Sequence, residues 1–254
     1  MILNSRIIGS SQKKIIILHG LLGSLDNWIT FGKKISNEGF EVHLVDQRNH
    51  GKSFHSNQFS YENMANDLKN YFNHFNIEKA SIIGHSMGGK TAMLFALQNS
   101  DLLNKLIIVD ILPVRYERDY ELIFDSLLNI DLRTIKSRND FYLHLKKYFS
   151  EDSFILFLSK NLQRSSEGKF SFKSNIKILK REISNITSEI NHDHFYQKEI
   201  IFIKGEHSDY IKESELKLSQ KLFPKYKLIT ISNAGHWLHH DNADDFFSVC
   251  LSNL

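Results

Sequence analysis

The sequence predicts an α/β fold in which helices flank a mostly parallel sheet and a helical cap is inserted. Three observations lead to this prediction. Strand-like apolar runs alternate with helical patterns in residues 1–112 and again in 198–254, as in parallel sheets with crossover helices. Residues 113–197 have helical patterns instead. Ser86, flanked by glycines, marks a sharp corner between a strand and a helix. We expect one domain, with its core in the first two segments and its cap in the third.

The composition is that of a globular protein with one core. A chain of 254 residues can bury one substantial core, and a single α/β domain with an insertion has this length. The hydrophobic fraction of 41% and the charged fraction of 24% exclude a disordered chain. The net charge is +3 and the lysines are spread out, without the basic cluster of a nucleic-acid binder. We expect no nucleic-acid partner, and the sequence does not indicate an oligomeric state.

The single cysteine and the N-terminal segment indicate a cytoplasmic protein. Cys250 has no disulfide partner within the chain, and its helical spacing from Phe246 predicts a buried thiol in a reducing compartment. Lys13 and Lys14 interrupt the apolar stretch near the N-terminus, and no apolar run approaches about 18 residues. We therefore expect neither a signal peptide nor membrane insertion.

The first elements follow from their apolar pattern. Residues 2–8 and 14–19 are predicted to be strands that form a short hairpin at one edge of the sheet. A helix over residues 28–37 follows, and Asp26 or Asn27 is its expected cap.

A polar loop at residues 46–53 separates a strand at 40–45 from a helix at 61–75. We interpret this loop as architecture, in which Asp46 and Arg48 pair with each other or with neighbouring loops, because pairs of this kind commonly fix loops. A contact of Arg48 with substrate is the alternative.

Ser86 lies where a buried strand, residues 80–83, turns into a helix, residues 90–97. Such a corner leaves no room for side chains two residues to either side, so sterics demand Gly84 and Gly88. The unpaired amides and the dipole of the new helix favour negative charge, which suits an alkoxide-like nucleophile. The alternative is a glycine-rich turn with an incidental serine.

A second loop follows the strand at residues 14–19 and has the sequence His-Gly-Leu-Leu-Gly-Ser. In an acyl-transfer enzyme its backbone N–H at Leu21, paired with that of Met87, would hold the negative oxygen of a tetrahedral intermediate. A tight turn without chemistry is the alternative.

Asp110 interrupts an apolar strand at residues 105–109 and precedes Pro113. A carboxylate at the end of a central strand requires a hydrogen-bond donor, such as an imidazole or loop amides. Once a nucleophile and a histidine are present, we interpret Asp110 as the acid that orients the base. An aspartate that accepts only local amides before Pro113 is the alternative.

The candidate base is His236, in the loop after the last predicted strand at residues 226–231. A strand at 199–204 and a helix at 213–223 precede that strand. We expect His239 and His240 to be surface residues at the start of the closing helix. The order of Ser86, an aspartate and His236 is the triad order of the α/β-hydrolase fold.

The inserted cap is predicted to be helical, with poor strand signals throughout. Open α/β sheets bind ligands at the carboxyl edge, where this cap would sit. Its aromatic residues are candidates to line an acyl pocket, although most are expected to form the core of the cap. The predicted helices span residues 117–130, 139–149, 154–162 and 176–190, and the aromatics include Phe124, Phe141, Tyr142, Tyr148, Phe149, Phe154 and Phe157.

In these motifs the chain resembles the α/β-hydrolase superfamily, and more narrowly the YbfF-like esterases. The resemblance covers nearly the whole chain and rests on HGLLGSLDNW, VDQRNHGKS, GHSMGGKTAM, LIIVDILPV and NAGHWLH in the same order. It implies a sheet of the eight-stranded type. It also implies Ser86 as nucleophile, His236 as base, and the amides of Leu21 and Met87 as oxyanion hole.

The position of the acid departs from the wider superfamily. There the acid commonly follows the strand at residues 199–204, and here that place holds Ser208, with Asp209 one residue later. In esterases resembling YbfF the acid comes from the strand after the nucleophile helix, which corresponds to Asp110. Asp209 remains the second candidate, because a loop can shift by one residue.

The expected reaction is hydrolysis of acyl esters or thioesters, including acyl-CoA, through an acyl-enzyme intermediate. No metal or organic cofactor is implied. Carbon–carbon bond hydrolysis, lyase chemistry and perhydrolysis on the same fold remain alternatives, as does a non-catalytic ligand-binding relative. A serine at the corner disfavours dehalogenases and epoxide hydrolases, which use a carboxylate there.

Overall fold

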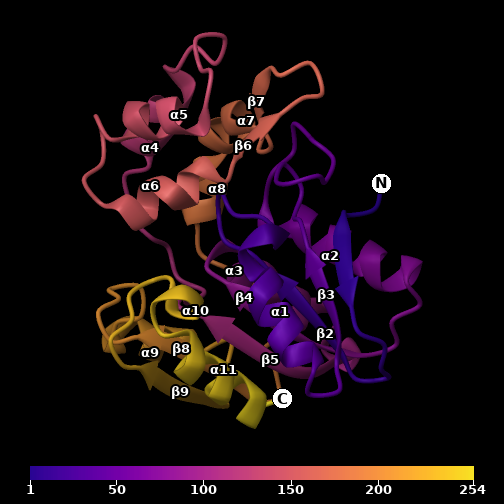
Figure 1. The fold of residues 1–254 in the computed structure, drawn as a ribbon. Coiled ribbons are helices and arrows are strands. Elements are labelled where there is room, and N and C mark those ends of the chain that lie inside the picture. Colours follow the sequence, from indigo (N-terminus) through magenta and orange to yellow (C-terminus); the bar gives the residue numbers. More distant parts are fainter.

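A seven-stranded sheet forms the centre of the protein (Figure 1). The computed structural model covers residues 1–254. The strands are β1 Ser5–Ile8, β2 Lys14–Leu18, β3 Glu41–Val45, β4 Ala80–His85, β5 Leu103–Val109, β8 Ile200–Gly205 and β9 Tyr226–Ile231. They lie in the order β1-β3-β2-β4-β5-β8-β9, and all neighbours are parallel except β1 and β3. The mostly parallel sheet is confirmed, with seven strands instead of the eight-stranded type.

The predicted hairpin between the first two strands is wrong. β3 lies between β1 and β2, antiparallel to the first and parallel to the second. The physical reason is burial, because Ile15 to Leu18 are all buried and need a strand on each side. Arg6 and Ile7 of β1 are exposed, which suits an edge strand.

Six helices belong to the same part of the chain as the sheet. They are α1 Ile29–Ser36, α2 Tyr61–His74, α3 Met87–Gln98, α9 Glu213–Ser219, α10 Leu238–Asp241 and α11 Ala243–Ser252, with short 3₁₀ turns at η1 Leu25–Trp28 and η2 Ser100–Leu102. The predicted cap of the first helix is wrong. Ser24 precedes η1, and its N–H donates to Asn27 Oδ1 at 2.9 Å, so Asn27 is the partner of the capping residue.

The two faces of the sheet bury separate apolar layers because side chains alternate along each strand. Ile15 and Ile17 belong to the layer that contains the apolar side chains of α1 and α11. Ile16 and Leu18 belong to the layer with α2 and α3. Cys250 of α11 is fully buried in the first layer, as predicted.

Residues 113–197, which we name the cap, lie between β5 and β8 and form a separate group of elements beyond one end of the sheet (Figure 1). A two-stranded hairpin in the cap was not predicted, because strands of three residues are too short to show a period of two. The elements are α4 Glu121–Leu128, α5 Arg138–Leu145, α6 Asp152–Ser159, β6 Leu162–Arg164, β7 Phe170–Phe172, α7 Ile176–Arg181 and α8 Ile183–Thr187.

A buried lysine joins the two connections between core and cap. Lys90 of α3 is 1% exposed, and its Nζ donates to Val114 O at 2.7 Å and to Ser188 O at 2.6 Å. The connections also bond to each other, since Ile190 N donates to Pro113 O at 2.8 Å. The base of the cap is therefore fixed to the helix that follows Ser86.

None of the helices is both long enough and apolar enough to cross a membrane.

Candidate active site

Ser86 occupies the predicted corner between β4 and α3, with a left-handed backbone (φ 52°, ψ −121°). A Cβ atom on Gly84 would lie 2.5 Å from Gly88 O, and one on Gly88 would lie 2.4 Å from Leu18 O. No side chain fits at these distances, so the steric argument for both glycines is confirmed. The corner leaves the serine half-buried, where a substrate can reach it.

Asp110 and His236 lie together, although 126 positions separate them in the chain. His236 Nδ1 is 2.8 Å from Asp110 Oδ2, and Asp110 is fully buried. Ser208 Oγ donates to Oδ2, and Gly205 N donates to Oδ1 at 3.3 Å, so the carboxylate has the donors that its burial requires. A bond from Nδ1–H to the carboxylate leaves Nε2 of His236 free to accept a proton.

Asp209, the second candidate for the acid, points elsewhere. Its side chain is 72% exposed and pairs with Arg118 at 2.5 Å. The Arg118 guanidinium holds the pKa of Asp209 below its ordinary value, chiefly through this hydrogen bond. The structure therefore brings Asp110, and not Asp209, to His236.

The loop that contains Leu21 is held in place through the next residue, Leu22. Leu22 has a left-handed backbone (φ 58°). Leu22 N donates to His50 Nε2 at 3.1 Å, and Leu22 O accepts from Asn161 Nδ2 of the cap at 2.6 Å. The N–H of Leu21 itself donates to no acceptor in the protein. Met87 begins α3, whose first amides have no partner within the helix. Both predicted oxyanion-hole amides are therefore candidates to bind an incoming oxygen.

His50 supports this loop as a neutral imidazole. Its Nδ1 donates to Arg48 O at 2.9 Å, so Nε2 is the nitrogen that accepts from Leu22 N. Burial lowers the pKa of His50 to about 3, which keeps Nε2 unprotonated.

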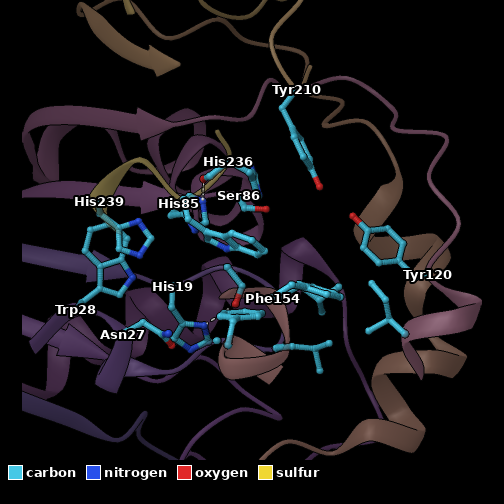
Figure 2. Close-up of a pocket in the computed structure, with 17 residues that line it drawn as sticks. His19, Asn27, Trp28, His85, Ser86, Tyr120, Phe154, Tyr210, His236 and His239 are labelled. Atoms are coloured by element: carbon cyan, nitrogen blue, oxygen red, sulfur yellow. Dashed lines mark hydrogen bonds between the residues drawn. The ribbon is translucent and has the colours of Figure 1, made fainter. Parts of the chain in front are cut away.

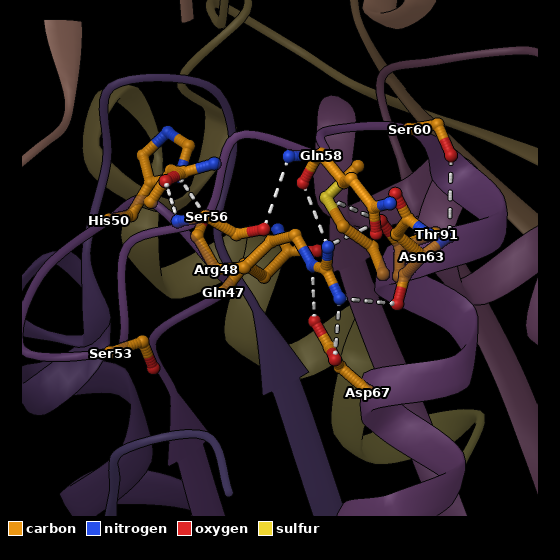
Figure 3. Close-up of polar contacts among 12 residues, drawn as sticks. Gln47, Arg48, His50, Ser53, Ser56, Gln58, Ser60, Asn63, Asp67 and Thr91 are labelled. Atoms are coloured by element: carbon orange, nitrogen blue, oxygen red, sulfur yellow. Dashed lines mark hydrogen bonds and ion pairs between the residues drawn. The ribbon is translucent and has the colours of Figure 1, made fainter. Parts of the chain in front are cut away.

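The polar loop at residues 46–53 is held by hydrogen bonds and an ion pair to other residues of the protein (Figure 3). Arg48 makes a bidentate pair with Asp67 of α2 at 2.5 and 2.8 Å. Asp46 instead accepts from the backbone N–H groups of Leu25 and Lys52. Asp46 and Arg48 do not pair with each other, and the structure shows the other predicted arrangement, contacts with neighbouring segments, since Leu25 and Asp67 both lie outside the loop. The contacts agree with an architectural role for the loop.

His236 is also held from its ring face and its backbone. The Tyr210 ring stacks on it at 3.8 Å between centroids, and the guanidinium of Arg118 covers the other face of Tyr210 at 3.9 Å. His85 Nε2 donates to His236 O at 2.8 Å. Sequence reasoning missed Tyr210, because nothing local indicates that it reaches a loop 26 residues away.

Ser86 and His236 line one cavity of about 230 Å³, which also borders the loop with Leu21 (Figure 2). Tyr120, Ile123, Phe154 and Phe157 of the cap form its apolar lining together with Trp237. Of the cap aromatics named above, Phe154 and Phe157 line the cavity, while Phe124 and Phe141 are buried in the core.

His239 was predicted to lie on the surface, and this is wrong. Its ring is half-buried, lines the cavity and stacks on Trp28 at 4.2 Å. The indole of Trp28 comes from η1, more than 200 positions away, so no local pattern indicates the contact. His240 is exposed, as predicted.

The structure contains no group of three or more His, Cys, Asp or Glu side chains placed to bind a metal ion.

Known proteins resemble this chain in sequence and in fold. The family described as alpha/beta hydrolase fold matches residues 13–243. The chain belongs to the α/β-hydrolase family. Among solved structures, a marine microorganism esterase superposes with a TM-score of 0.96 at 40% identity, covering 100% of this chain and 99% of the esterase.

Curated relatives of this α/β hydrolase include esterases and a lipase. The mouse sn-1-specific diacylglycerol lipase ABHD11 is 32% identical over 252 residues, covering 94% of this chain and 80% of the lipase. Esterase YbfF of Escherichia coli is 31% identical over 235 residues, covering 92% and 90%. The predicted resemblance is confirmed, and the protein is an enzyme of the esterase and lipase type.

Proposed function

We propose that this hydrolase cleaves carboxylic esters through an acyl-enzyme intermediate, with Ser86 as nucleophile, His236 as base and Asp110 as acid. The observation that supports the proposal best is the 2.8 Å contact of His236 Nδ1 with buried Asp110, beside a cavity that His236 and Ser86 both line. The order of the three residues in the chain and their roles match the triad of this fold.

In the proposed reaction, His236 Nε2 takes the proton of Ser86 Oγ as the oxygen attacks the ester carbonyl. Asp110 holds the imidazole in the reactive tautomer and stabilises the imidazolium that forms. The N–H groups of Leu21 and Met87 bind the negative oxygen of the tetrahedral intermediate. His236 then protonates the leaving alcohol, and a water molecule that it activates releases the acid from Ser86.

The substrate class is supported by the cavity and by the relatives. Phenylalanines of α6 beside the nucleophile suit an acyl chain, because ligand pockets bind apolar groups through such side chains. The named relatives are esterases and a lipase that acts on diacylglycerol, so esters are the first choice. Thioesters, including acyl-CoA, are a second substrate class for the same mechanism. A chain-length series of acyl esters and acyl-CoA thioesters distinguishes the two.

Replacement of the nucleophile tests the proposal directly. Ser86→Ala should remove the burst of acyl-enzyme formed from an activated ester, because no other group is placed to carry the acyl group. The burst is measured by stopped-flow absorbance, and labelling of Ser86 by a fluorophosphonate probe provides a second readout. A burst of unchanged amplitude in the variant would end the proposal.

A further inference from the structure

One end of the Ser86 cavity is lined by polar ring atoms instead of cap phenylalanines. Trp28 is 1% exposed and lines the cavity, yet its indole N–H has no acceptor in the protein. Figure 2 shows Trp28, Asn27 and His239 together on one side of Ser86, opposite Tyr120 and Tyr210. An N–H group that borders a cavity and has no protein acceptor is available to a bound ligand or to water. This end of the cavity therefore offers an unused donor.

His85 adds an acceptor to the same end. Its Nε2 must carry the proton, because it donates to the carbonyl of His236 at 2.8 Å. Burial lowers the pKa of His85 well below its ordinary value, so the ring is neutral and Nδ1 has a free lone pair. No protein donor reaches this Nδ1. Both rings line the cavity and their centroids are 6.2 Å apart, so the two free nitrogens belong to neighbouring side chains of the same part of its wall.

Two neighbours complete this polar end. Asn27 Oδ1 is used by Ser24 N, while the Asn27 NH₂ group donates to no acceptor in the protein and the residue lines the cavity. His239 lies nearly parallel to Trp28, at 15°, and its buried Nδ1 has no partner. The stack holds the indole in one orientation, so the unused donor is preorganised.

We propose that this polar end, formed by Trp28, Asn27 and His85, binds a hydroxyl group of the substrate. A hydroxyl accepts from the indole or amide N–H and donates to His85 Nδ1, whereas a carboxylate has no proton for that nitrogen and a methyl group satisfies neither. The preferred substrates are therefore esters that carry a free hydroxyl close to the ester group, on the acyl or the alcohol side. This inference rests on the proposed ester hydrolysis and names its substrate class.

The test compares three esters of nearly equal size: propyl butyrate, 2-hydroxyethyl butyrate and propyl 3-hydroxypropanoate. In the second and third esters a hydroxyl replaces the terminal methyl group of the alcohol chain or of the acyl chain. For each protein, the kcat/KM of a hydroxy ester is divided by that of propyl butyrate, and comparing this ratio between proteins cancels intrinsic reactivity. For one hydroxy ester we expect Trp28→Phe and Asn27→Ala each to lower the ratio about three- to tenfold, the effect of one lost hydrogen bond.

The other tryptophan of the chain provides the matched control. Trp237 packs against Phe154 and Phe157 at the cap end of the cavity, so Trp237→Phe should change absolute rates and leave the ratios unchanged. Asn27→Ala removes no apolar core side chain and carries the test if Trp28→Phe does not fold; because it also removes the acceptor of Ser24 N, circular dichroism must show that the variant is folded.

The possible outcomes separate the two proposals. If wild-type protein hydrolyses propyl butyrate but neither hydroxy ester has a ratio that falls in Trp28→Phe or Asn27→Ala, the hydroxyl site is wrong and water occupies it. If wild-type protein hydrolyses none of the three esters, the proposed ester hydrolysis is wrong, and the hydroxyl site with it.

Discussion

At the residue scale, Ser86 and Asp110 share an unusual backbone conformation. Both have φ 52°, in the left-handed region that a residue with a side chain enters at a cost on the order of 1 kcal/mol. Each follows the last residue of a buried strand, and each N–H is bonded to the next strand, Ser86 N to Val109 O and Asp110 N to Ile203 O. The sheet thus maintains both strained residues at one edge, which is typical of functional positions.

The identity of the acid gives a prediction at this scale. Asp110→Asn should lower kcat by roughly four orders of magnitude, as the equivalent change does in a serine protease, because the amide no longer fixes the proton on His236 Nδ1. Asp209→Asn is the matched control and should leave kcat within a few-fold of wild type, since Asp209 contacts Arg118 and not the base. Steady-state kinetics with one activated ester measures both, and a severe loss confined to Asp209→Asn would contradict the assignment.

The sequence predicted these residues to different extents. Ser86 and its glycines follow from local sterics, which the sequence contains in full. The choice of Asp110 over Asp209 depended on family resemblance, because the contact with His236 joins the end of β5 to the loop after β9, which are far apart in the chain. His85 and His239 belong to local motifs, but their roles depend on Trp28 and on the backbone of His236, which lie far away in the chain.

At the scale of elements, the cap reaches the loop that would hold the oxyanion. Asn161 is buried, and its Nδ2 donates to Leu22 O at 2.6 Å, while its Oδ1 accepts from Ser174 Oγ at 2.5 Å. On the core side, the N–H of Leu22 donates to His50 Nε2. Leu22 is therefore fixed from two elements, and the orientation of the Leu21 amide depends on both. This makes Asn161 a positioning residue.

Removal of this contact should affect the chemical step more than binding. We expect Asn161→Ala to lower kcat roughly tenfold with a smaller change in KM, because a loose Leu21 amide stabilises the transition state less, and loss of a whole donor costs about a hundredfold or more. Asn185→Ala is the control, since Asn185 also links cap to core, through Phe59 O, without reaching the loop. Steady-state kinetics of both variants is the measurement. An equal loss of kcat in the two variants would show that any contact between cap and core has this effect, and that Asn161 does not position the loop.

The sequence patterns predicted the bounds of the helices and strands better than they predicted which strands pair with each other. Most helices and strands lie within a few residues of their predicted bounds, since the apolar period is local. The pairing of β1 with β3 was missed because it joins segments that are not adjacent in the chain, and burial of the strand between them decided the order. The β6–β7 hairpin was missed because three-residue strands carry no period.

At the scale of the whole molecule, three buried histidines make stability depend on pH. Burial lowers the pKa of His19 to about 4 and of His50 to about 3, and it lowers the pKa of His85 well below the ordinary value. In the unfolded chain each titrates near 6.5. Between these values the unfolded state binds up to three more protons at these three histidines than the folded state, and His43 and His239, whose pKa burial also lowers, add to the difference. Stability is therefore full above about pH 6.5 and decreases as the pH falls.

We therefore expect the free energy of unfolding to fall by about 4 kcal/mol per pH unit from His19, His50 and His85 between pH 6 and pH 4.5, with a further contribution from His43 and His239, since each extra proton bound by the unfolded chain contributes about 1.4 kcal/mol per unit. Urea unfolding followed by circular dichroism across this range is the measurement. His50→Gln removes one titrating group and keeps an acceptor for Leu22 N in its amide oxygen, so its slope should be smaller by about one proton. His55→Gln, at an exposed position, should keep the wild-type slope. A wild-type stability that does not change between pH 7 and pH 4.5 would mean that these imidazoles are protonated in the folded protein, which contradicts the acceptor role of His50 Nε2.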